Sequence, residues 1–167
     1  MQHDGPAPGA RPPTAVSATP VRRTPFPRGM LPAGAMLARL VATGLPLGPL
    51  RLLHTVGRRS GRPHVVPVAV HRHAGSEWLV SPFGEVAWVH NVRAQGRAEL
   101  EAGRRRRAVA LTEVTDDRRP AVLRGYRRAF RAVPFVRAAF ARTPLHDDAA
   151  LAEAAARHPV FLVREER

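Results

Sequence analysis

The 167-residue sequence contains no cysteine, lysine or isoleucine, and only one asparagine (Asn91) and one tyrosine (Tyr126). The lack of cysteine excludes disulfides, zinc–cysteine sites, iron–sulfur clusters and thiol nucleophiles. No apolar run reaches the roughly 18 uncharged residues that a membrane-spanning helix needs. The first 20 residues hold Asp4 and five prolines instead of an apolar segment, so we expect no signal peptide and a cytoplasmic protein.

Positive charge is abundant: all 27 residues counted as Lys or Arg are arginine, and the formal net charge is +14. Such a charge normally indicates nucleic acid or another anionic partner. The rare residue types have AT-rich codons, however, and the abundant Ala, Arg and Pro have GC-rich codons, so a GC-rich genome explains part of the charge. Nucleic acid is also disfavoured because only nine residues are aromatic (six Phe, two Trp, one Tyr) and no reader motif is present.

The chain divides into three parts. Residues 1–28, rich in Pro, Gly, Ala and Thr, predict a disordered tail that also carries arginines. Residues 29–49 contain an apolar stretch at 30–45 with one charge, Arg39, which predicts a short helix and a linker. This helix either packs on the domain or lies on an anionic membrane surface. Residues 50–167 form one domain long enough to bury a hydrophobic core.

Within this domain, short strands alternate with helices. The pattern predicts strands at 50–55, 64–71, 77–81, 98–102, 106–114 and 158–164, and helices at 85–94, 116–131 and 147–157. Pro67 argues for a bulge or a sheet edge, and Gly103 marks a hairpin turn that we expect to carry the run 104–107, four arginines. The arrangement predicts a mainly β fold, a small β-barrel with flanking helices.

The first segment that could carry chemistry is GRRSGRP at 57–63. Its glycines allow a tight turn, on which Arg58, Arg59 and Arg62 and free backbone N–H groups could converge on an anion. The spacing excludes a Walker motif. The alternative is a solvated basic hairpin turn, as an arginine-biased chain would produce.

The second segment is SPFGEVAWVHNVRA at 81–94, where a strand ends in a glycine turn and runs into a helix. Free N–H groups at that helix end favour a carbonyl or an anion. Asn91 lies inside the helix and needs a hydrogen-bond partner. The alternative is that Trp88 packs in the core and Asn91 bonds to neighbouring backbone.

The sequence gives little support to a metal site or a hydrolytic triad. The eight histidines show no metal-ligand spacing, so we expect no metal site. No Gly-x-Ser-x-Gly elbow is present, and Ser60 and Ser81 lack a visible base and orienting group, which argues against a hydrolytic triad.

Three motifs occur in order: LLHTVGRRSGRP at 52–63 with Pro67 after it, WVHNVRA at 88–94, and PVFLV at 159–163. Together they resemble the deazaflavin-dependent nitroreductase family over about the last two-thirds of the chain. That family is actinobacterial, which agrees with the codon pattern. The resemblance implies an FMN-binding-like split β-barrel, monomeric or homodimeric, that passes a hydride from reduced coenzyme F420 (an 8-hydroxy-5-deazaflavin) to a quinone or nitroaromatic acceptor, without a metal.

The resemblance also assigns site residues, all of them cofactor-binding. These are Arg58, Arg59 and Ser60 in the phosphate-binding turn, His64, Val65, Val66, Pro67, Val68 and Ala69 in the cofactor-lining strand, Leu79, Val80 and Ser81 where a strand end meets the ring, and Ala87, Trp88 and Asn91 at the helix start. The Ser81 hydroxyl is the candidate catalytic group, as a proton relay or a donor to developing negative charge.

The sequence departs from the family in three places. His64 stands where an arginine is common, which makes a phosphate contact pH-dependent or removes it. The loop between Ser81 and Trp88 is shorter. Val133 and Val136 fall where aromatic residues are expected, so a proton-donating tyrosine is missing and nitroreductase activity is less expected than cofactor binding. The alternatives are an FMN- or haem-type split-barrel protein and a basic nucleic-acid-binding module.

Overall fold

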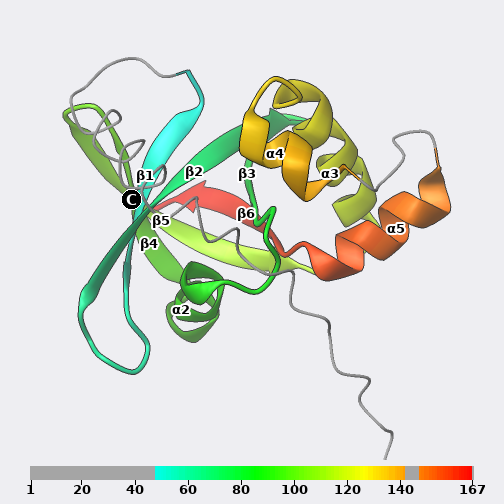
Figure 1. Cartoon of the computed structure of the whole chain (residues 1–167). Coiled ribbons are helices and arrows are strands. Elements are labelled where there is room, and N and C mark those ends of the chain that lie inside the picture. The colour runs from blue at the N-terminus through cyan, green and yellow to red at the C-terminus, as the bar shows by residue number, and fades with distance from the viewer. Residues whose placement is uncertain (1–47, 142–146, 167) are drawn as a thin grey trace, which may run out of the picture.

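The computed structural model describes residues 48–141 and 147–166 (Figure 1). The predicted tail at 1–28 and the predicted helix at 30–45 lie outside the described residues. The strands are β1 (Leu50–Val56), β2 (Pro63–His73), β3 (Ser76–Val80), β4 (Arg97–Ala102), β5 (Arg105–Val114) and β6 (Val160–Glu165). The helices are α2 (Ala87–Gln95), α3 (Arg118–Ala129), α4 (Pro134–Ala139) and α5 (Asp148–Arg157).

The six strands form a closed antiparallel barrel in the order β1-β2-β3-β6-β5-β4. Helix α2 connects β3 to β4, and α3, α4 and α5 lie between β5 and β6 in the chain. Figure 1 shows these three helices together on one side of the barrel and α2 near its lower end. The predicted class, a mainly β split barrel with flanking helices, is confirmed. No helix in the described ranges is long and apolar enough to span a membrane.

Alternation along the strands builds two hydrophobic cores, because neighbouring strand residues point to opposite faces. Leu53, Leu79 and Phe161 belong to the inner core, inside the barrel, and none of the three is exposed. Trp78 and Val160 belong to the outer core, beneath α3, α4 and α5. The barrel is therefore filled by side chains, and a ligand must bind at its ends or on its outside.

Each element predicted between residues 50 and 167 is present with small shifts at its ends, and within the described residues α4 is the helix that the sequence did not indicate. It has only six residues and begins with Pro134, so it carries too short a pattern to be recognised. The arginine run was placed wrongly in part: Arg104 lies in the turn, but 105–107 already belong to β5.

Helix α2 is tied to the barrel by a charged network. The Arg93 guanidinium donates two hydrogen bonds to Glu113 on β5, at 2.7 and 2.8 Å, and one to Glu85 at 2.8 Å. These bonds, chiefly those to Glu113, raise the pKa of Arg93. The bidentate pair fixes α2 against β5.

Candidate functional site

The basic segment forms the turn between β1 and β2. The Gly57 N–H donates to the Arg62 carbonyl, and the Gly61 N–H donates to the Gly57 carbonyl, both at 2.8 Å. Gly61 has a φ of +64°, which favours glycine. Arg58, Arg59 and Arg62 are all exposed, and no ion pair engages them within the described residues. The turn thus presents three uncommitted guanidinium groups on a closed backbone loop.

Asn91 holds this turn from the side of α2. Its Oδ1 accepts a hydrogen bond from the Arg58 N–H at 3.1 Å, and its Nδ2 donates to the Thr55 Oγ1 at 3.2 Å. The Thr55 hydroxyl donates in turn to the His64 carbonyl at 3.3 Å. The Asn91 side chain is buried, with 4% exposed. The partner that Asn91 required is therefore the basic turn itself, and Asn91 positions Arg58.

Beside the turn, the first half of β2 has an open edge. On β2, only Val70–His73 pair with β3 in the described chain, so Pro67 lies where β2 is paired with β1 alone. This agrees with the expected sheet edge at a proline. Val56 and Val65 lie on the same face of the hairpin, and among the described residues they are the large hydrophobic ones that are exposed, at 45% and 43%. An apolar face thus adjoins the basic turn.

The predicted site residues separate into an accessible and a buried group. Side chains at least partly exposed are those of Arg58, Arg59, Ser60, His64, Val65, Val66, Pro67 and Ala87. Buried ones are those of Val68, Ala69, Leu79, Val80, Ser81, Trp88 and Asn91. Trp88 packs against Phe161 in the inner core, with ring centroids 5.5 Å apart. Of the buried group, Val68, Leu79 and Trp88 belong to the inner core, and Ala69 and Val80 belong to the outer core. In this structure a ligand can therefore reach only the accessible group.

Ser81 stabilises the turn that follows β3. Its hydroxyl donates to the Gly84 carbonyl at 2.6 Å, and the side chain is fully buried. The Ser81 carbonyl lies 3.2 Å from the Nδ1 of His158. Burial lowers the pKa of His158 to about 4, so this ring is neutral near pH 7. In this conformation the Ser81 hydroxyl is engaged in the turn.

The positions where family members have aromatic residues are filled by aliphatic packing. Val136 is buried in the outer core beside Phe140, and Val133 packs against the same core. Tyr126 belongs to that core as well, with its ring 4.7 Å from Phe130, and burial raises the pKa of its hydroxyl. Tyr126 is thus a core residue and does not replace the missing tyrosine at a surface.

Three contributors to the site were missed in the sequence. Thr55 links Asn91 to β2, the Gln95 side chain donates to the Val56 carbonyl at 2.9 Å, and His158 supports the Ser81 turn. Thr55 lies within the motif at 52–63, directly before Val56 and Gly57, so its polar side chain on a strand was the available signal. Within the described residues, no three His, Asp or Glu side chains gather as a metal centre would require.

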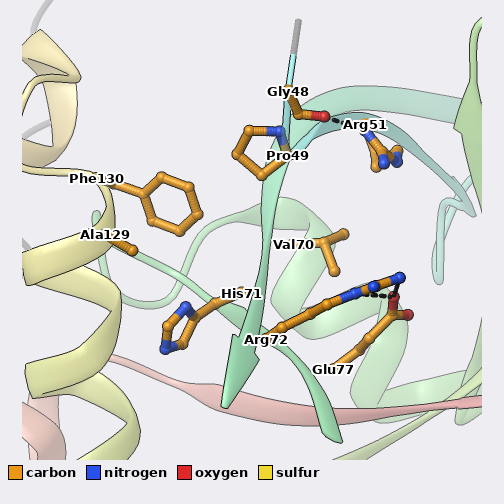
Figure 2. Close-up of a pocket in the computed structure, with 9 residues that line it drawn as sticks. All are labelled: Gly48, Pro49, Arg51, Val70, His71, Arg72, Glu77, Ala129 and Phe130. Atoms are coloured by element: carbon orange, nitrogen blue, oxygen red, sulfur yellow. Dashed lines mark hydrogen bonds and ion pairs between the residues drawn. The ribbon is translucent and has the colours of Figure 1, made fainter. Parts of the chain in front are cut away.

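Two cavities open at the other end of the barrel, away from the basic turn. The smaller, of about 510 Å³, is shown in Figure 2. His71 and Phe130 lie on one side of it, and Arg72 and Glu77 lie on the other, joined to each other by an ion pair. The larger cavity, of about 940 Å³, shares Arg51, Arg72 and Glu77 with the first.

The chain is similar to a known protein family and to several solved structures. Residues 35–140, more than half of the chain, match the family model described as F420H(2)-dependent quinone reductase. A solved F420-H2 dependent reductase, FDR-A, is 19% identical with a TM-score of 0.47, over 70% of this chain and 94% of that one. A heme binding protein from Mycobacterium smegmatis is 14% identical with a TM-score of 0.46, over 77% of this chain and 51% of that one. No curated protein matches.

Proposed function

Because the chain belongs to the F420H(2)-dependent quinone reductase family, we propose that it transfers a hydride from reduced coenzyme F420 to a small electron-poor acceptor. Membership makes the protein an oxidoreductase and confirms the resemblance to F420-dependent enzymes found in the sequence. We propose quinones as the first class of acceptor and nitroaromatic compounds as the second.

The accessible residues fit the coenzyme chemically. Its phosphodiester and polyglutamate tail make it a multiple anion, and Arg58, Arg59 and Arg62 offer guanidinium groups suited to phosphate and carboxylate. The Nδ1 of His64 is buried without a hydrogen-bond partner among the described residues, which suits a group that a ligand completes. The flat deazaflavin needs a largely apolar surface, which the exposed Val56 and Val65 supply.

The observation that carries the proposal is the Asn91 bridge. A solvated basic turn needs no buried amide to fix its backbone, whereas a binding turn gains from being held in one conformation before the ligand arrives. In this assignment Arg58, Arg59 and Ser60 receive the anionic tail, and the open edge of β2 lies along the ring. Ala87, exposed at the start of α2, is within reach of the ligand, whereas Leu79, Val80 and Trp88 contribute through packing in the cores.

When bound, the coenzyme supplies the hydride, and the chain binds and orients the reactants. Ser81 as a proton relay stays a prediction. It requires the hydroxyl to exchange the Gly84 carbonyl for the acceptor, because that carbonyl now takes its hydrogen bond. Should Ser81 act only in the turn, Ser81→Ala would lower stability without changing the pH profile of the rate.

We also propose where the reaction takes place and leave two oligomeric states to be tested. The cytoplasm is the expected location, and contact of residues 30–45 with an anionic membrane surface would bring an apolar acceptor to the protein. A homodimer and a monomer are both compatible with the barrel. Light scattering of the purified chain, and its sedimentation with anionic and neutral vesicles, distinguish these cases.

The decisive experiment measures binding of reduced F420 by fluorescence, followed by its oxidation with menadione and with a nitroimidazole. We expect micromolar or tighter binding, faster oxidation with menadione, and a roughly tenfold weaker Kd in Arg59→Ala from loss of a charge-assisted contact. Arg128→Ala, an exposed arginine on α3, is the matched control. Absence of binding overturns the proposal. Purification with bound FMN or haem, or duplex binding that weakens steeply with salt, would favour the alternatives.

A further inference from the structure

We propose that the barrel end opposite the basic turn holds a second binding site, for an organic phosphate that carries an apolar group. The proposal is independent of the F420 site, because none of the residues predicted for that site lines the cavity involved. The cavity measures about 940 Å³ and lies where the β2–β3 turn, the β4–β5 turn and the end of β6 meet. In Figure 1 the β4–β5 turn is at the upper left, opposite the long β1–β2 hairpin at the lower left.

Seven arginines surround this cavity: Arg51, Arg72, Arg164 and the run 104–107. They come from the strands β1, β2, β5 and β6 and from the β4–β5 turn. Only two acidic residues, Glu77 and Glu165, line the cavity with them, which leaves a formal excess of five positive charges. The lining of this cavity is therefore strongly basic.

Because side chains alternate along a strand, some of these arginines lie on the inner face of the barrel at its mouth. Arg51 stands two residues before Leu53, and Arg107 stands two residues before Val109. Leu53 and Val109 are fully buried in the inner core, and residues two apart on a strand share a face. Arg51 and Arg107 thus form a rim directly above the inner core. Arg72, two residues after the buried Val70, belongs to the same rim.

The acidic residues neutralise only some of the arginines. Glu77 pairs with Arg72 at 3.2 Å and also with Arg107, and Arg106 pairs with Glu101 at 2.8 Å. Arg104, Arg105 and Arg164 have no ion-pair partner in residues 48–141 and 147–166. Guanidinium groups held close together repel one another, and a phosphate that accepts bidentate hydrogen bonds from them removes that repulsion.

Besides the arginines, apolar side chains line part of the cavity, and Leu162 among them is partly exposed. Leu100 and Val163, only 2% and 6% exposed, line it below the arginines. The small residues Ala102 and Gly75 leave the space above them open. Ligand sites in barrel mouths combine an apolar wall with a few polar anchors. The fitting ligand therefore has a phosphate at the rim and an apolar group against these side chains, as in a free phosphate ester or a phospholipid headgroup region.

The test uses the full chain with hexyl phosphate in calorimetry, and vesicles of phosphatidylcholine with and without phosphatidic acid in sedimentation. The variant is Arg104→Gln/Arg105→Gln, which removes exposed arginines that lack ion pairs. Arg128→Gln/Arg131→Gln on and just after α3 lowers the net charge equally at another exposed place. Arg59→Ala reports on the basic turn.

We expect the first variant to weaken binding about tenfold or more, since each charge-assisted hydrogen bond contributes strongly. The control pair should bind as the parent does, and Arg59→Ala should keep the binding event that Arg104→Gln/Arg105→Gln loses. Binding of hexyl phosphate identifies a free ester as the source, and binding of phosphatidic acid vesicles alone identifies a lipid headgroup. Binding of neither, or equal weakening in both double variants, overturns the proposal. F420 binding is measured separately, so failure of one site leaves the other unaffected.

Discussion

Replacing Asn91 by alanine tests whether a buried amide prepares the basic turn for binding. The change removes two hydrogen bonds, at 3.1 Å to the Arg58 N–H and at 3.2 Å to the Thr55 hydroxyl. Each contributes about 0.5–1.5 kcal/mol, and a partner left unsatisfied in a buried place adds to the cost. Asn91 is only 4% exposed, so water replaces the lost bonds poorly. We expect a loss of about 2 kcal/mol in the free energy of unfolding.

The same change should weaken F420 binding about tenfold, because a loosened turn must be ordered again on binding, and roughly 1.4 kcal/mol corresponds to a factor of ten. Urea unfolding gives the stability and fluorescence titration gives the Kd. Thr55→Val keeps the shape of Thr55 and removes the hydroxyl, so Asn91→Ala combined with Thr55→Val measures their coupling energy.

Three outcomes would contradict this reasoning. Unchanged stability in Asn91→Ala would mean that water or a neighbouring group replaces the amide. Lower stability with an unchanged Kd would mean that Asn91 serves the fold alone and that the turn needs no preparation for its ligand. Additive effects of the two substitutions would show that Asn91 and Thr55 do not act as one network.

Three further predictions concern stability and catalysis. Burial lowers the pKa of His158 to about 4 in the folded protein, against an ordinary value of 6.5. Between pH 6.5 and pH 4 the unfolded chain therefore binds a proton that the folded chain does not, and stability is lost as the pH falls through this range. The shift in pKa corresponds to about 3 kcal/mol of stability. Denaturation curves from pH 7 to 4 should therefore be flatter in His158→Gln, and parallel curves would exclude this role. Gly84 and Gly75 both have a φ of +73°, but a Cβ on Gly84 would lie 3.2 Å from the Arg157 carbonyl oxygen, whereas one on Gly75 would have no atom within 4 Å. Gly75→Ala should therefore cost only the roughly 1 kcal/mol of the left-handed backbone, and Gly84→Ala should lower the melting temperature further. Equal shifts in melting temperature would refute the crowding at Gly84. If the Ser81 hydroxyl relays a proton, Ser81→Ala should lower the turnover of menadione and change the pH dependence of the rate. An unchanged rate and pH profile would mean that Ser81 only stabilises the turn through its hydrogen bond to the Gly84 carbonyl.

The sequence alone was sufficient to locate nearly all the elements, because period-two and helical patterns are local properties. It also identified the basic turn, since glycines at 57 and 61 flank Arg58 and Arg59 with no other residue type between them but serine. The motif order was enough to recognise the family, since confirmed by the match over residues 35–140.

Only the tertiary structure decided which of those residues meet and which are reachable. Asn91 and Arg58 are 33 positions apart, and their contact depends on how α2 docks beside β1. Burial of Ser81 and the low pKa of His158 arise where β3 meets the segment before β6. The arginine rim forms because barrel closure brings the ends of β1, β2 and β5 that carry Arg51, Arg72 and Arg107 to one mouth. Alternation along a strand determines which side chains share a face, but strand pairing between distant segments determines which faces share a site.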